Sequence, residues 1–131
     1  RAASRRRDAF LHRKREELGE SLVASTLGLN DLLNARGTQE IESLARDRDA
    51  ERLHLLCRLY FPSLVVPACR YLDAGTGVHR ALLETYDPSD PRSCGAQAAD
   101  TAAFKQARAE LVQARDTLVG LVAEETLTRH R

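Results

Sequence analysis

Apolar residues recur every three or four positions along most of the chain, and no segment alternates polar and apolar residues as a strand does. The pattern predicts four helices, at residues 5–36, 39–60, 64–86 and 96–128. Short connections between neighbouring helices favour antiparallel packing. We therefore predict an all-α protein, an antiparallel up-down-up-down four-helix bundle with long first and last helices, whose single domain spans residues 5–131.

The first and last predicted helices carry the clearest apolar stripes. In the first helix, Phe10 and Leu11 precede a stripe of residues at helical spacing: Leu18, Leu22, Ser25, Leu29, Leu32 and Leu33. Gly37 is the expected stop, and Thr38 the N-cap of the next helix. In the last helix, two heptad positions are apolar or small, with Val122 beside them: Phe104, Leu111 and Leu118 at one, and Ala107, Ala114 and Leu121 at the other.

The most apolar window is LHLLCRLYFPSLVVPAC, residues 53–69, which Pro62 and Pro67 interrupt. Proline disfavours helical geometry in the residue before it, so the second helix should end at Phe61. Ser63 is the predicted N-cap of the third helix, with Pro67 in or near the first turn, where a missing N–H costs nothing. The window is therefore predicted to be a corner that joins two buried half-helices.

The predicted inner faces of the two middle helices are less regular. The second helix combines leucines with two arginines on one face: Ile41, Leu44, Ala45, Arg48, Arg52, Leu55, Leu56 and Leu59. The third helix has an apolar face with a histidine: Val65, Val66, Cys69, Leu72, His79, Leu82, Leu83 and Tyr86. Gly75 and Gly77 predict a kink or break in it. Arg48 and Arg52 are the candidate residues of a polar groove or interface.

Composition and charge fit one globular domain with an uneven charge distribution. The 131 residues are 43% apolar and 30% charged, with a net charge of +1. Residues 1–15 hold seven basic side chains against one aspartate, a local charge of +6, so the remainder carries −5. The 18 arginines against 2 lysines are typical of GC-rich coding rather than of a nucleic-acid surface.

The basic segment at residues 1–15 is either a separate arm or the start of the first helix, and three roles for it stay open. It can be a solvated helix start in which acidic neighbours pair with Arg13 and Arg15. It can contact nucleic acid, although no interleaved aromatic residue or known reading motif supports this, so a nucleic-acid partner is not expected. It can also be the cytoplasmic flank of a membrane helix removed from before Arg1. The window at residues 53–69 is not itself a membrane span, because it contains Arg58 and two prolines.

The cysteines and histidines give weak candidates for a metal site. Cys57, Cys69 and Cys94 are an odd number, which favours reduced thiols in a cytosol-like compartment. His54 and Cys57 stand at i, i+3, the spacing of half a zinc site, and Cys69 follows the proline corner. His79 is a further soft ligand on the third helix. Buried cysteines more often pack as small apolar residues, so we expect no metal and no cofactor.

Glu51 and His54 have the Glu-x-x-His spacing of di-iron bundles, but no second copy of that motif exists. No phosphate-binding glycine loop, Ser-x-x-Lys pair or His-Glu-x-x-His helix is present either. The sequence therefore predicts a non-enzymatic protein with no catalytic residues.

Our leading hypothesis is a helical bundle that acts through protein–protein contacts, with a partner protein or a second copy. It is expected in the cytoplasm, either free or tethered to the inner face of a membrane. The layout resembles, in general plan only, bacterial proteins with an N-terminal anchor, an arginine-rich juxtamembrane helix and a small helical domain. The alternative is a small-ligand or metal sensor with a site near the proline corner at residues 60–67.

Overall fold

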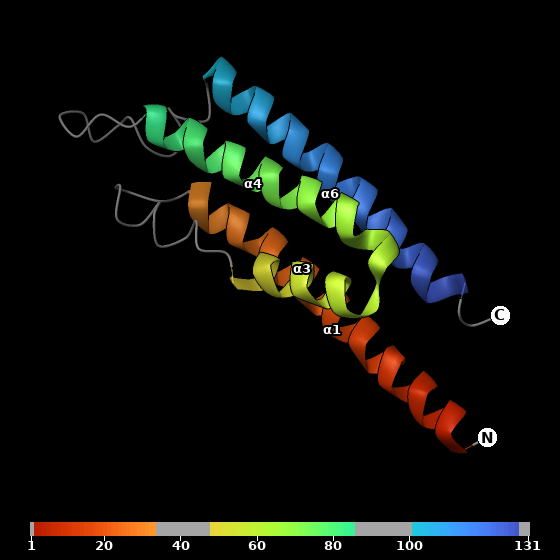
Figure 1. Cartoon of the computed structure of the whole chain (residues 1–131). Helices are drawn as coiled ribbons and strands as arrows, with labels where there is room; N and C mark the ends of the chain where they lie inside the picture. Colours follow the sequence, from red (N-terminus) through yellow and green to blue (C-terminus); the bar gives the residue numbers. More distant parts are fainter. Residues whose placement is uncertain (1, 34–47, 86–100, 129–131) are drawn as a thin grey trace.

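The computed structural model describes residues 2–33, 48–85 and 101–128, and these ranges are helical except at Phe61 and Thr101. They form α1 (Ala2–Leu33), α3 (Arg48–Tyr60), a 3₁₀ turn η1 (Pro62–Leu64), α4 (Val65–Thr85) and α6 (Ala102–Thr128) (Figure 1). The all-helical prediction is thus confirmed for this part of the chain. The predicted ends at residues 34–36, 39–47, 86 and 96–100, together with Gly37 and Thr38, lie outside the described residues.

The helices pack as a bundle made of two close pairs. Helix α1 packs against α3, and α4 packs against α6, while contacts of α3 with α4 and of α1 with α6 join the pairs (Figure 1). Each of the four helices in the described part of the chain, together with η1, contributes buried apolar side chains to one core. Its largest fully buried members come from every helix: Phe104, Leu18, Leu53, Leu118, Val78 and Cys57. A shared core of this kind is what holds amphipathic helices together in water.

The predicted stripes of the outer helices agree with the structure at most of the positions whose side chains are described, although Phe10, placed at the start of the first stripe, is exposed. Leu18, Leu22 and Ser25 are buried on α1. On α6, the heptad residues Phe104, Leu111 and Leu118 are buried. Helix α6 begins at Ala102 because Thr101 caps it: the Phe104 N–H donates to Thr101 Oγ1 at 3.2 Å, which satisfies one of the free donors of the first turn.

The proline corner follows the prediction except at Ser63. Helix α3 ends at Tyr60, and the Phe61 N–H still donates to the Cys57 carbonyl at 2.9 Å. The Leu64 N–H then donates to the Phe61 carbonyl at 2.9 Å, which closes η1. Ser63 lies inside this turn, so its predicted role as N-cap of the next helix is wrong. Pro67 is the third residue of α4, where its missing N–H breaks no helical hydrogen bond.

The predicted inner faces of α3 and α4 are wrong in part, because leucine content does not mark the buried side. Leu55 and Leu59 are 55% and 60% exposed, as is Val66 on α4 at 60%. The buried positions are instead occupied largely by smaller or aromatic residues: Ala50, Leu53, Leu56 and Cys57 on α3, and Ala68, Tyr71, Val78, Ala81 and Leu82 on α4. Small side chains let two helices approach closely. Alanines are therefore found on the inner faces of α3 and α4.

Of the kink or break predicted at Gly75 and Gly77, the break does not occur, because α4 continues without interruption from Val65 to Thr85, while a kink stays a prediction. A Cβ at either glycine would meet nothing within 4 Å, so these glycines are not needed for a close approach. Each costs a helix about 1 kcal/mol relative to alanine. The burial of Tyr71, Val78 and Leu82 on the same helix offsets that cost.

A buried hydrogen bond links the two helix pairs. The hydroxyl groups of Ser25 on α1 and Tyr71 on α4 lie 2.7 Å apart, and both residues are buried. Neither sequence stripe predicts this pair, since Tyr71 is absent from the predicted face of the third helix. Polar groups buried in a core are normally paired in this way.

We expect Tyr71→Phe to lower the free energy of unfolding by about 1 kcal/mol, the usual net value of a buried hydrogen bond. Urea unfolding of Tyr71→Phe, Ser25→Ala and the double variant gives the pairwise coupling energy. A coupling energy near zero would show that the two hydroxyls do not stabilise each other.

Candidate functional site

Two clusters of polar and reactive side chains lie on different sides of α3. The lysine cluster, on the side of α1, consists of Phe10, Lys14, Glu17, Arg52 and Tyr60. The thiol cluster, on the side of α4, consists of His54, Cys57 and Cys69. Residues 52 and 54 are two positions apart, about 200° around the helix axis, so Arg52 and His54 point in nearly opposite directions.

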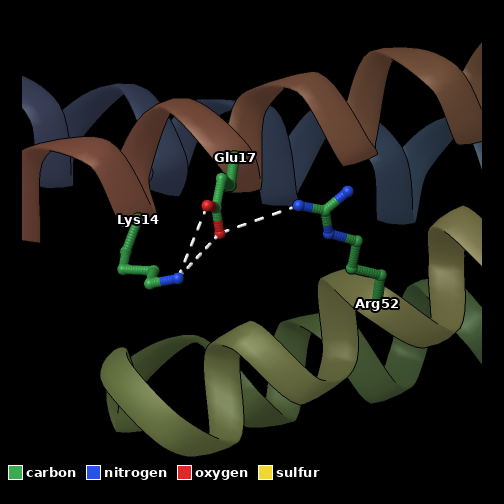
Figure 2. Close-up of polar contacts among 3 residues, drawn as sticks. All are labelled: Lys14, Glu17 and Arg52. Atoms are coloured by element: carbon green, nitrogen blue, oxygen red, sulfur yellow. Dashed lines mark hydrogen bonds and ion pairs between the residues drawn. The ribbon is translucent and has the colours of Figure 1, made fainter.

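Glu17 is the centre of the lysine cluster. Its Oε2 accepts a hydrogen bond from Lys14 Nζ at 3.1 Å on the same helix, and lies 3.7 Å from a terminal nitrogen of Arg52 on α3 (Figure 2). Figure 2 shows both cations reaching the one carboxylate from opposite sides. The Arg52 side chain is 57% exposed, so the interhelical pair is screened by water and stabilises the fold only weakly.

Two aromatic rings surround the Lys14 ammonium group. Lys14 Nζ lies 5.2 Å from the Phe10 ring centre and 5.4 Å from the Tyr60 ring centre. The two rings meet edge to face, with their centres 5.4 Å apart. Both distances are within the range of a cation–π interaction, and the edge-to-face geometry is a favourable one for aromatic pairs. Through these contacts Lys14 links the early turns of α1 to the end of α3.

The structure places the two predicted interface arginines differently. Arg52 forms an ion pair with Glu17 where α1 and α3 pack, so its guanidinium group is already partly engaged within the chain. Arg48 is the first residue of α3 and is exposed. Their role in an interface stays a prediction.

Two exposed faces, one on α1 and one on α3, combine charge with apolar surface. On α3 the face consists of Arg48, Arg52, Leu55 and Leu59, at 4-3-4 spacing. On α1 it consists of Glu16, Glu20, Val23 and Leu27, at the same spacing. Val23 and Leu27 are 59% and 61% exposed. We call these the basic face of α3 and the acidic face of α1. Spacing of this kind puts four side chains on one side of a helix.

The thiol cluster bridges the proline corner. His54 Nε2 on α3 lies 3.3 Å from Cys69 Sγ on α4, and both residues are half-buried. Cys57 is fully buried, with none of its surface exposed. Burial, together with the smaller effect of the negative charge of an ionised Cys69, raises the pKa of the Cys57 thiol from 9.0 to about 11. Cys57 is therefore a neutral thiol at physiological pH.

The predicted soft ligands do not form a complete metal site. His79 lies ten residues beyond Cys69 on α4, about 15 Å away along the helix axis. Among residues 2–33, 48–85 and 101–128, no group of three histidine, cysteine or acidic side chains is arranged to hold a metal ion. Cys94, the third cysteine of the chain, lies outside these ranges. The structure thus brings His54 and Cys69 together but leaves His79 apart.

A groove of about 430 Å³ runs between α4 and α6 and begins at Pro67. Its lining mixes apolar surface with polar side chains of both charges: Arg70, Asp73, Glu110, Gln113 and Thr117, with Ala74 and Ala114. Small-molecule sites of this size are usually lined by apolar and aromatic side chains. The groove therefore offers space and some apolar surface for a small ligand, but no aromatic side chain of the described residues lines it.

The lysine cluster was missed at the level of sequence, although one signal for it exists. Phe10, Lys14 and Glu17 stand at i, i+4 and i+7, so they share one side of α1. Lys14 is also one of only two lysines in an arginine-rich chain. The approach of Tyr60 and Arg52 depends on how α3 packs on α1, which spacing along one helix does not determine.

Comparison with protein-family models, with curated proteins and with solved structures gives no match. Function must therefore be argued from the geometry of the chain itself. Of the helices described, none is both long enough and apolar enough to cross a lipid bilayer.

We expect Lys14→Ala to lower the free energy of unfolding by about 1 kcal/mol, because it removes two cation–π contacts and one ion pair. The matched control is Lys105→Ala, which removes the other lysine from an exposed position on α6. Denaturant unfolding of both variants tests the difference. Equal stability of the two would contradict a structural role for the lysine cluster.

The raised pKa of Cys57 predicts a loss of stability at alkaline pH. Because the folded state holds the Cys57 proton more tightly than the unfolded chain, this contribution is complete below pH 9 and is lost as the pH rises toward 11. The loss is at most about 3 kcal/mol. Urea unfolding at several pH values should show a shallower decline for Cys57→Ala than for the unchanged protein. Parallel declines would mean that other groups cause the loss.

Proposed function

We propose that the chain is a non-enzymatic helical bundle that acts by self-association, with its helices arranged antiparallel in up-down-up-down order. The acidic face of α1 in one copy packs against the basic face of α3 in the other. The observation that carries this proposal is the exposure of Leu55 and Leu59 in line with Arg48 and Arg52 on one side of α3.

Both faces expose apolar surface that association would remove from water. Because the apolar side chains of the two faces are 55–61% exposed, burying the exposed part of each contributes about 1–2 kcal/mol. A symmetric dimer buries Val23, Leu27, Leu55 and Leu59 of each copy. The loss of translational and rotational freedom opposes association by about 4–15 kcal/mol. Self-association in the micromolar range is the expected balance.

The charge pattern indicates that the partner is a second copy of the chain, and it sets the register in which the two helices pack. Each face spans eleven residue steps, about 16 Å of helix. When the faces run parallel, Glu16 meets Arg48, Glu20 meets Arg52, and the apolar halves of the two faces meet each other. Complementary charges of this kind fix register and exclude wrong partners more than they add affinity.

A two-fold axis perpendicular to the helices satisfies this register. With up-down order, α1 and α3 run antiparallel within one copy. Such an axis reverses the direction of every helix in the second copy, so α3 of the partner copy runs parallel to α1. The same contact then forms twice, as in most homodimers. Helix order and dimer geometry thus support one another.

A cytoplasmic location, with or without a membrane tether, belongs to the same proposal. The early turns of α1 are exposed and carry Arg5, Arg6 and Arg7. Clustered arginines next to a membrane helix mark its cytoplasmic side, and they attract anionic lipid headgroups. The alternative function, a small-ligand sensor, draws its support from the groove beside Pro67 alone, which makes it the weaker candidate.

We expect sedimentation velocity at micromolar concentration to show a reversible dimer. Leu55→Glu with Leu59→Glu should raise the dissociation constant at least about 100-fold, since it removes four leucines from the dimer contact and adds four buried charges. Val119→Glu, an exposed valine on α6, is the matched control and should leave the constant unchanged.

Charge reversal tests the register. Glu16→Arg and Arg48→Glu should each weaken the dimer, and the two together in one chain should restore it, because the pair is re-formed with opposite sign. A strictly monomeric protein at the highest soluble concentration would overturn the proposal. Dimer formation without rescue would overturn the proposed faces.

A further inference from the structure

The thiol cluster contains a contact between a histidine and a thiol that plays no part in the proposed self-association. His54 Nε2 lies 3.3 Å from Cys69 Sγ, within hydrogen-bonding distance for sulfur. The two residues are fifteen positions apart and meet because η1 turns α4 back along α3. Cys69 is only half-buried, so part of the residue is open to small reagents, whereas Cys57 is fully buried.

We propose that His54 and Cys69 form a reactive thiol pair, at which a hydroperoxide oxidises Cys69 to a sulfenic acid. The thiolate, not the thiol, is the nucleophile, and a neighbouring imidazole can take the thiol proton. Redox-active cysteines are typically accessible and placed beside such a basic group. A purely structural cysteine is buried among apolar side chains, as Cys57 is.

The reaction is balanced by the peroxide and the two residues alone. His54 accepts the proton of the Cys69 thiol, which leaves a thiolate beside an imidazolium. The sulfur attacks one peroxide oxygen, so an S–O bond forms while the O–O bond breaks. The leaving oxygen takes the proton from His54 and departs as water or, from an organic hydroperoxide, as an alcohol. Sulfur is oxidised by two electrons, and the peroxide is reduced by two.

Cys57 is an internal contrast within the same cluster. It is shielded from solvent, and burial raises the pKa of its thiol to about 11. It therefore presents neither an accessible sulfur nor a thiolate at neutral pH. Modification should be selective for Cys69, although the two cysteines lie close enough for the charge of one to influence the other.

The test uses the full chain with Cys94→Ser, which leaves Cys57 and Cys69 as the only thiols. The protein is treated with hydrogen peroxide at pH 7 in the presence of dimedone, and the adduct is located by peptide mass spectrometry. We expect the adduct on Cys69 and none on Cys57. An adduct mainly on Cys57, or none on Cys69, would overturn the proposal.

The role of His54 is tested by rate. Since an ordinary thiol is only about 3% ionised at pH 7, loss of the base in His54→Gln should slow oxidation of Cys69 at least about fivefold. The difference should vanish near pH 10, where exposed thiols ionise without help. His12→Gln, which changes an exposed histidine on α1, is the matched control and should leave the rate unchanged. Equal rates for His54→Gln and the parent at pH 7 would overturn the role of His54.

A second comparison does not depend on the folding of His54→Gln. In a chain carrying Cys57→Ala, Cys69→Ser and Cys94→Ser, Ala109→Cys places a thiol on an exposed part of α6. The described part of that helix contains no histidine. Cys69 should react with peroxide faster than this more accessible thiol at pH 7. A slower reaction would show that the contact with His54 does not activate Cys69.

Discussion

The turn at Pro62 determines which residues of α3 and α4 can meet. Proline has no N–H to continue the α3 ladder, and the chain closes a 3₁₀ turn instead, with Leu64 bonded back to Phe61. Because the turn is only three residues long, Cys69 on α4 returns to the level of His54 on α3. Further along α4, Tyr71 reaches Ser25 of α1. A longer or looser connection would place both pairs out of register.

Helix α3 is the element on which the proposed functions depend, because different sides of one short helix make different contacts. Leu53, Leu56 and Cys57 face the core. Arg52 points toward α1 and Glu17, while His54 points toward Cys69 on α4. Leu55 and Leu59 remain exposed. Thirteen residues thus supply a core face, two polar contacts to neighbouring helices and an apolar surface available to a partner.

The sequence predicts the buried side of the last helix well because apolar residues recur there at regular heptad spacing. Phe104, Leu111 and Leu118 keep one heptad position on α6, and all are buried. It predicts the middle helices poorly for a physical reason. Leucines stand both on the buried side of α3, at Leu53 and Leu56, and on its exposed side, at Leu55 and Leu59, so leucine content alone does not select the buried face. Ala50 on α3 and Ala68 on α4 lie on the buried faces instead. Their small side chains permit close packing but contribute little to the apolar pattern of the sequence.

The two clusters of the candidate site could be predicted from the sequence only in part. His54, Cys57 and Cys69 are found from residue type and spacing, but their distances depend on the tight turn at η1. The distinction between the two thiols depends on burial, which the sequence does not reveal. Tyr60 and Lys14 were not expected to meet, since their contact requires α1 to extend past the end of α3.

The two proposals place different demands on α3 and can therefore fail separately. Self-association needs the outer side, with Leu55 and Leu59, and makes no use of a thiol. Oxidation of Cys69 needs His54, on the side turned toward α4, and makes no use of a second copy. A sulfenic acid at Cys69 adds a polar oxygen where α3 and α4 pack, beside the fully buried Cys57. Burial of a new polar group opposes that packing, so oxidation acts first on the α3–α4 contact. Oxidation can therefore affect the dimer only by shifting α3. The side of α3 that faces α1 is held by contacts with Glu17 and Lys14.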